Sequence, residues 1–280
     1  MFDSIRRSIE LTKASLRVLR SDKELLLFPF VSFIALVVVT ASFAVPFALM
    51  DGFTSVSEGT VDIGTMILGF AFYIVSYTVI FFFNTALVGA AMIRLDGGDP
   101  TLGDGFRIAF SRLPQIIAYA LVAATVGMIL RWISERAGIV GQIIAGGLGF
   151  AWSVATFLVV PILVAEKVGP IEAIKRSGGL LRKTWGEQII GNVGIGLVFG
   201  VAAVIVALLG VALIIALAQV SVALAIVGVV IVVLLVGAIA LVGSAVSGIF
   251  TASLYRYATK GDGGQMYRTE ALSGAFKPKG

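Results

Sequence analysis

The sequence predicts an all-α, polytopic transmembrane helical bundle, with about six spans arranged as three hairpins and amphipathic interfacial helices on the cytoplasmic side. Two observations lead to this fold class. The 280-residue chain is 59% hydrophobic and only 13% charged, about half the charge of a typical soluble domain. Its longest charge-free run, between Glu187 and Arg256, is long enough for two or three membrane crossings of about 20 residues each.

Six apolar runs, separated by polar or glycine-rich breaks, are the expected spans. They cover Leu25–Met50, Met66–Ile93, Pro114–Ile133, Ile139–Ala165, Ile189–Ala218 and Val220–Tyr255. Only a weakly polar segment around Gln219 separates the last two, so a tight turn is expected there. The spans form one domain over residues 25–255, between a cytoplasmic N-terminal segment (1–24) and a cytoplasmic tail (256–280).

Lys and Arg indicate the orientation, because loops on the cytoplasmic side of a membrane carry an excess of them. If both termini are cytoplasmic, all but two of the 21 basic residues lie inside, and only Arg131 and Arg136 flank a very short outer turn. The sequence therefore predicts a multi-pass protein of the inner or plasma membrane, with its N- and C-termini in the cytoplasm.

A short amphipathic stretch precedes each pair of spans: Arg6–Arg20, Pro100–Arg112 and Pro170–Lys183. Apolar and basic residues at helical spacing are typical of a helix that lies in the membrane interface. Ser21 to Glu24 has the pattern of a capping box that opens the first span. The shared plan indicates either true internal repetition or loops that look alike because the positive-inside rule shapes all of them.

Composition excludes several kinds of chemistry. The chain contains no Cys and no His, which excludes disulfides, thiolate metal sites, Ser-His-Asp triads and His-based proton relays. No convincing charge lies in the middle of a span, whereas an ion-coupled transporter usually has one. We expect no cofactor and no metal. The net charge of +5 lies in the cytoplasmic segments, which favours anionic lipid headgroups as partners over nucleic acid. The sequence does not decide whether the protein forms a homo-oligomer or binds a protein partner.

The candidate site is a set of polar residues at the cytoplasmic face: Arg94, Glu166, Lys175, Arg176 and Ser177. Glu166 ends a span shortly after Pro161 and could bind a cation or a proton, but an ion pair with Lys167 or a neighbouring Arg is the favoured interpretation. Arg176 and Ser177, with the basic residues around them, could hold a lipid phosphate or could only determine topology. A binding or catalytic site would be favoured if one cytoplasmic pocket contained Arg94, Glu166 and Arg176.

Several stretches resemble an uncharacterised family of prokaryotic multi-span membrane proteins. They are SLRVLRSDKELLLFP, IRLDGGDPTLGDGF, GFAW, VVPILVAEKVGPIEAIKRSGGLLRKTWGE and LYRYA. The plan is also similar to the membrane domains of glycerophosphodiester phosphodiesterases, although the catalytic His, Glu and metal-binding residues of that enzyme have no counterpart here. The resemblance implies a fold class and a membrane location, and no activity.

The leading expectation is a non-catalytic integral membrane protein that associates with lipid or a partner, in scaffolding or envelope maintenance. The alternative is a small-molecule transporter or permease-like protein, suggested by the hairpin plan and the Pro-interrupted spans. A membrane-embedded lipid enzyme is a third class, which would need catalytic Asp, Glu, Arg or Lys gathered at the cytoplasmic face.

Overall fold

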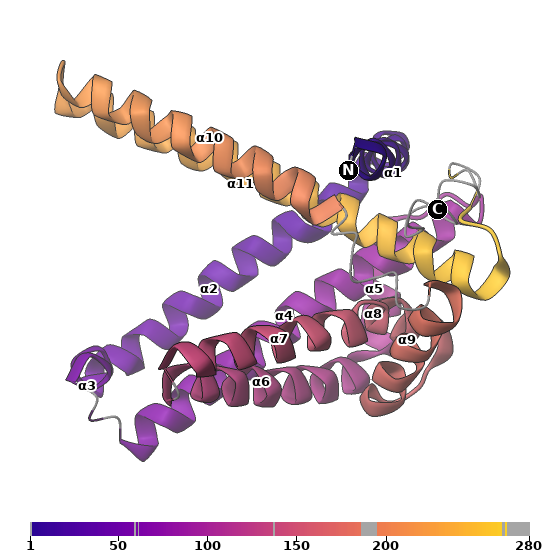
Figure 1. Cartoon of the computed structure of the whole chain (residues 1–280), viewed down its shortest axis with the longest axis horizontal. Coiled ribbons are helices and arrows are strands. Elements are labelled where there is room, and N and C mark those ends of the chain that lie inside the picture. Colours follow the sequence, from indigo (N-terminus) through magenta and orange to yellow (C-terminus); the bar gives the residue numbers. More distant parts are fainter. Residues whose placement is uncertain are drawn as a thin grey trace. The chain divides into compact units, whose positions relative to one another are not determined.

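The computed structural model describes residues 2–58, 60, 62–136, 138–185, 195–264 and 267, and every element in these ranges is a helix (Figure 1). Six helical segments in these ranges are long and apolar enough to cross a membrane. They are Lys23–Leu49, Ile63–Leu95, Leu113–Arg136, Gly138–Glu166, Val198–Ala218 and Val222–Lys260. The predicted all-α polytopic fold is therefore confirmed, and the chain is a multi-pass membrane protein.

The helices follow the predicted order, in which a short helix precedes each hairpin. The short helices are α1 (Phe2–Ser21), α5 (Leu102–Ser111) and α9 (Pro170–Trp185). The hairpins are α2 (Leu27–Leu49) with α4 (Ile63–Leu95), α6 (Leu113–Arg136) with α7 (Gly138–Thr156) and α8 (Val159–Glu166), and α10 (Ile195–Ala218) with α11 (Val222–Lys260). Residues 189–194 of the fifth predicted span, and 265–266 and 268–280 of the tail, lie outside the described residues.

The tight turn predicted near Gln219 is confirmed, since α10 ends at Ala218 and α11 begins at Val222. Ser221 caps α11, and its Oγ accepts the N–H of Ala223 at 3.2 Å. A side-chain oxygen in this position pairs one of the N–H groups that the first turn of a helix leaves open. A single polar cap residue is therefore enough to separate two long apolar helices.

Two short helices were not predicted from the sequence: a 3-10 helix, η1 (Lys23–Leu26), precedes α2, and the first loop contains α3 (Gly52–Glu58). The fourth span is broken between α7 and α8, close to Pro161, as its proline indicated. The capping box predicted at Ser21 is wrong. Ser21 still belongs to α1, and its Oγ donates to the carbonyl oxygen of Val18 at 2.7 Å. The last turn of a helix offers open carbonyl groups, which compete for such a hydroxyl.

The chain divides into two compact units. Unit 1 holds Met1–Leu26, Ala91–Gly98 and Trp185–Gly280, and unit 2 holds Leu27–Ala90 and Asp99–Thr184. Unit 1 thus combines α1 and η1 with the last turn of α4 and the α10–α11 hairpin. Unit 2 combines the other helices, with α4 as far as Ala90. Each unit contains residues from distant parts of the sequence.

In unit 1, α10 and α11 pack side by side, and α1 packs against both (Figure 1). A Cβ atom on Gly210 of α10 would lie 2.7 Å from Cγ1 of Val232 in α11, so the close approach of the two helices depends on glycine. The buried face of α1 follows a helical spacing of three and four residues. It consists of Leu11, Ala14, Val18 and Leu19, with the polar Thr12 and Ser15 between them.

In unit 2, α6 and α7 pack side by side, and α5 packs against α2 and α4. A Cβ atom on Gly105 of α5 would lie 2.8 Å from the carbonyl oxygen of Ala86 and would also meet the ring of Phe28. The neighbouring Phe106 ring lies 5.5 Å from the Phe28 ring and 6.0 Å from the Phe83 ring, edge to face in both cases. Gly105 therefore allows α5 to approach α2 and α4 closely, and the Phe106 ring packs against both of these spans.

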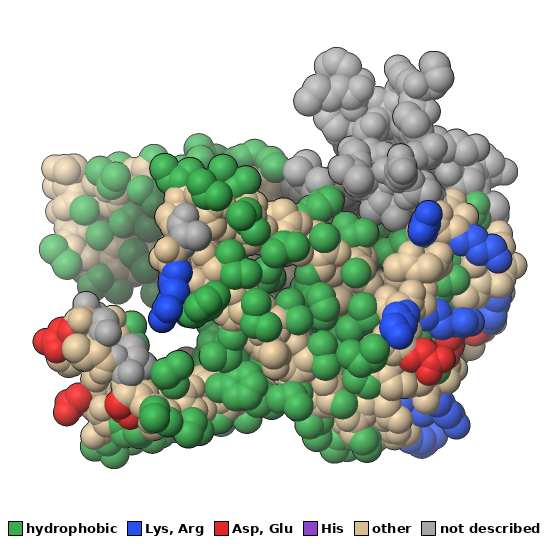
Figure 2. Space-filling model, turned by 60° about the horizontal axis from the view of Figure 1, so that its bottom comes forward, with side chains coloured by type: hydrophobic (Ala, Val, Ile, Leu, Met, Phe, Trp, Pro, Cys, Tyr) green, Lys and Arg blue, Asp and Glu red, His purple; other side chains and the backbone are tan. Residues whose placement is uncertain are grey.

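The spans expose large apolar side chains, including Phe33 on α2, Ile67 on α4 and Ile143 on α7. Figure 2 shows this apolar surface, and it shows Lys and Arg side chains gathered at the end of unit 2 where α9 lies. An apolar surface of this extent suits lipid as the surrounding solvent, because helices already pair their backbone groups internally.

Candidate functional site

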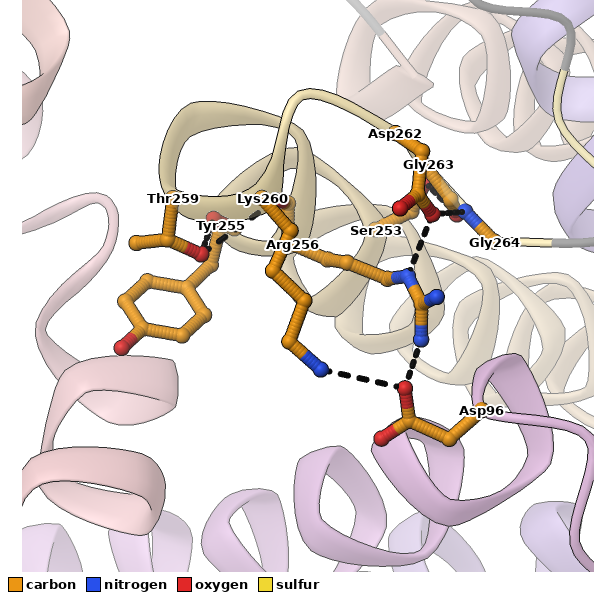
Figure 3. Close-up of polar contacts among 9 residues, drawn as sticks. All are labelled: Asp96, Ser253, Tyr255, Arg256, Thr259, Lys260, Asp262, Gly263 and Gly264. Carbon is orange, nitrogen blue, oxygen red and sulfur yellow. Dashed lines mark hydrogen bonds and ion pairs between the residues drawn. The ribbon is translucent and has the colours of Figure 1, made fainter.

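Two acidic turns form a polar cluster in unit 1 at the ends of α4 and α11 (Figure 3). Asp96 directly follows α4, and Asp262 follows Gly261, where α11 ends in the left-handed conformation with φ 81°. Two glycines follow each of these aspartates, and Gly97 is also left-handed, with φ 91°. Glycine in this conformation terminates a helix without steric cost. The cluster was not predicted from the sequence, although the Asp-Gly-Gly pattern occurs at both helix ends.

Arg256, in the last turns of α11, links the two aspartates. Its Nε donates to Asp262 Oδ1 at 2.6 Å, and its Nη1 donates to Asp96 Oδ1. Lys260 Nζ donates to the same Asp96 oxygen at 3.2 Å. Asp262 Oδ1 also accepts the N–H of Gly264 at 3.0 Å. The hydrogen bond from Arg256, aided by this N–H, holds the pKa of Asp262 below its usual value.

The charges within this cluster balance, since two carboxylates face two cations. The Asp96 side chain is half exposed, whereas that of Arg256 is largely buried. Exposed ion pairs contribute little to stability, so the cluster acts chiefly by positioning. It joins the end of α4 to the end of α11 and to the turn that follows.

Arg94, a candidate residue from the sequence, belongs to unit 1 and pairs with Asp22. The Nη2–Oδ2 distance is 3.3 Å, and the Asp22 side chain is only 5% exposed. A carboxylate buried to this degree needs a charged or hydrogen-bonding partner. Because Asp22 lies between α1 and η1, this ion pair joins the start of the first span to the end of the second.

Tyr267 returns the chain to α1 after α11. Its hydroxyl forms a hydrogen bond with Ser15, and both residues are buried. Burial raises the pKa of Tyr267 above its ordinary value, so the phenol stays neutral. Gly264, with φ 94°, allows the turn before it, since a Cβ atom there would lie 3.0 Å from the Leu95 side chain.

In unit 2, Glu166 ends α8 and pairs with Arg176 of α9. From the sequence, a pair with Lys167 or with a neighbouring Arg was expected. Between them, Lys167 takes the left-handed conformation with φ 55°, and Pro170 opens α9. The Glu166 side chain is 16% exposed and that of Arg176 is 52% exposed. Lys175, beside Arg176, is exposed. This arrangement presents basic groups outward and leaves the carboxylate against the protein.

Ser177 lies next to Arg176 but is fully buried, and its hydroxyl faces the break between α7 and α8. Pro161 has no N–H, so the helix cannot continue through the carbonyl group of Phe157. At this break, the N–H of Leu158 donates to Ser177 Oγ at 3.0 Å. Ser177 therefore satisfies a backbone N–H group at the break in this span. Sequence spacing alone did not indicate this role.

The structure thus places Glu166, Lys175, Arg176 and Ser177 together on α8 and α9, and it places Arg94 in unit 1. Across the described ranges, no group of three His, Cys, Asp or Glu side chains is positioned to hold a metal ion. The sites of both units join helix ends through ion pairs and buried hydroxyl groups.

Comparison with known proteins gives one family. The model of a family described as "Family of unknown function (DUF6159)" matches residues 63–265. This range runs from the start of α4 past the end of α11, and it includes both acidic turns and the α8–α9 site. A search of curated proteins finds no match to the chain.

Proposed function

The chain belongs to DUF6159, a family of unknown function, and we propose that it is a non-catalytic membrane protein that associates with anionic lipids. Its role would be scaffolding or envelope maintenance in the inner or plasma membrane of a prokaryote. The exposed surfaces of the three short helices support this function.

One observation carries the proposal, and α1, α5 and α9 share it. Each buries one narrow face and exposes basic residues, which are Lys13, Arg17 and Arg20 on α1, Arg107 on α5, and Lys175, Arg176, Arg182 and Lys183 on α9. Among the side chains that the structure describes, each of these helices exposes a large apolar residue: Ile9, Phe110 or Ile171. Exposed cations beside an exposed apolar residue suit the boundary between lipid headgroups and acyl chains.

The proposed orientation has these helices and both termini in the cytoplasm. It is supported by the distribution of Lys and Arg, all but two of which lie in the segments assigned to that side. The cytoplasmic leaflet carries anionic lipids, and each Lys or Arg near its surface contributes about 1 kcal/mol of attraction.

A lipid competition experiment tests the association. The full chain, purified in mild detergent, is offered equal amounts of phosphatidylglycerol and phosphatidylcholine, and bound lipids are counted by native mass spectrometry. We expect phosphatidylglycerol to predominate, and we expect high salt to reduce the excess because it screens charge. Replacing Lys13, Arg17, Arg20, Arg107, Arg182 and Lys183 together by Gln should abolish the preference. Equal binding of the two lipids to the wild-type protein would overturn the proposal.

A small-molecule transporter is the second candidate, favoured by the interrupted fourth span. Transporters often bind substrates where a membrane helix is broken. Here the break lies at Leu158, three residues before Pro161, and the following residues of α8 are buried as far as Val164. Solute flux into vesicles that contain the protein, lost in Pro161→Ala, would favour transport over scaffolding.

A further inference from the structure

A groove of about 650 Å³ runs beside α1 in unit 1. Ligand sites in proteins typically have volumes of about 300–1,000 Å³, so the groove is large enough for a small molecule or a lipid headgroup. The described residues that line it come from α1, with Tyr267 as the exception. Tyr267 is also part of the contacts described for the candidate site.

The charged lining of the groove favours an anion. Lys13, Arg17 and Arg20 line it, are all exposed, and follow one another at spacings of four and three residues. This spacing places them on one face of α1. Glu10 is the single carboxylate among the described lining residues. Three cations against one carboxylate suit a phosphate group, which Lys binds as a point charge and Arg binds through two hydrogen bonds.

The remaining lining residues are apolar or aromatic. A free phosphate ion has no apolar surface that could pack against them. Leu16 is half-buried, and buried aliphatic residues of α1 lie beside it. Tyr267 contributes a buried ring, whose hydroxyl is held by Ser15. The glycerol and first methylene groups of a phospholipid provide apolar surface directly next to a phosphate, and they match this combination.

We infer that this groove binds the headgroup of an anionic phospholipid, with Lys13, Arg17 and Arg20 holding its phosphate. Leu16 and Tyr267 then lie against the glycerol backbone. The inference rests on the proposed lipid association and goes further, because it assigns one saturable site to α1 and leaves α5 and α9 with general attraction only.

The test uses the full chain in detergent and three soluble probes: short-chain phosphatidylglycerol, short-chain phosphatidylcholine and inorganic phosphate. One variant carries Lys13→Gln, Arg17→Gln and Arg20→Gln. Its matched control carries Arg107→Gln, Arg182→Gln and Lys183→Gln, which removes the same charge from exposed positions of α5 and α9. Gln resembles Lys and Arg in helix propensity, and thermal unfolding without ligand verifies that both variants fold. If the first variant does not fold, Lys13→Glu and its control Arg107→Glu replace the pair.

We expect one saturable phosphatidylglycerol site in the wild-type protein. The α1 variant should bind it roughly a hundredfold more weakly. The control loses only the general attraction of α5 and α9, so its affinity at the saturable site should fall far less than that of the α1 variant. Equal weakening in both variants, with the wild-type preference intact, would overturn the α1 site and leave the proposed function standing. Phosphate binding as tightly as the lipid would overturn the lipid assignment. No preference for phosphatidylglycerol in the wild-type protein would overturn the proposed function itself.

Discussion

Single hydroxyl groups in this protein pair backbone groups that its helices leave open. Ser177 Oγ accepts the N–H of Leu158, and Ser253 Oγ donates to the carbonyl oxygen of Gly263 at 2.7 Å. Both serines are fully buried. Leu158 lies within a span, and because lipid offers no hydrogen bonds, an unpaired backbone group in lipid is costly. The structural role of these small polar residues, at helix breaks and helix ends, is therefore to pair backbone groups.

Ser177→Ala tests this role. The variant leaves the buried N–H of Leu158 without its partner, which should lower the free energy of unfolding by about 1–3 kcal/mol. Ser153→Ala is the control, because Ser153 is exposed and its Oγ donates within its own helix, to the carbonyl oxygen of Gly149 at 2.9 Å. Denaturant unfolding in mixed micelles measures both. The same small effect in the two variants would show that the break does not depend on Ser177.

At the scale of elements, α5 shows how a short amphipathic helix is placed. It opens with a capping box, in which Thr101 Oγ1 accepts the N–H of Asp104 at 3.2 Å and Asp104 Oδ2 accepts the N–H of Thr101 at 3.0 Å. The Thr101 hydroxyl also donates to Asp104 Oδ2, at 2.7 Å. This hydrogen bond, together with the one from the Thr101 N–H, holds the pKa of Asp104 below its usual value. The cap fixes where the helix begins, and Gly105 allows its backbone to approach α4.

Two glycines of α5 allow a matched experiment. An alanine Cβ at position 105 would lie 2.8 Å from the backbone oxygen of Ala86, whereas at position 103 its nearest neighbour would be Thr101 Oγ1 at 3.6 Å. Gly103→Ala should be neutral or stabilise by up to about 1 kcal/mol, because alanine favours helix. Gly105→Ala should destabilise by about 1–3 kcal/mol through overpacking.

Thermal unfolding in detergent compares the two variants on one helix. The difference between their midpoints isolates the steric term, because both substitutions change helix propensity in the same direction. Equal shifts of the midpoint in Gly105→Ala and Gly103→Ala would show that the stability of the protein does not depend on the close packing of α5 against α4.

At the scale of the whole molecule, the sequence alternates short charged helices with long apolar hairpins. The proposed topology puts α3 outside the cell and α9 inside. Because the chain has no cysteine, single cysteines can be introduced without background. Ser177, in the middle of α9, is unsuitable as a labelling position because it is fully buried. Glu58 and Lys183 are exposed.

We therefore expect Glu58→Cys to react with a membrane-impermeant maleimide in intact cells. Lys183→Cys should react only after permeabilisation, and the cysteine-free parent should not react at all. The reversed pattern would refute the orientation predicted from Lys and Arg. Labelling of both positions in intact cells would refute the assignment of α3 and α9 to opposite sides.

Of the candidate site, the sequence indicated only that Glu166 would pair with Lys167 or with a neighbouring Arg. Arg176, which lies one turn and part of a helix further along the chain, is the partner in the structure. Arg94 was singled out, but its partner Asp22, 72 residues away, was not. The paired Asp-Gly-Gly turns were visible in the sequence, yet nothing local indicated that Arg256 links them.

The sequence by itself determined the six spans, the short amphipathic helices and the turn at Gln219, because hydropathy, helical periodicity and helix-ending residues act within a few turns of the chain. Only the tertiary structure decided which polar groups meet. Asp96 and Arg256 are 160 residues apart, and Ser15 and Tyr267 are 252 apart. Such contacts depend on how apolar helices pack, and near-uniform apolar surfaces carry little local information about their partners.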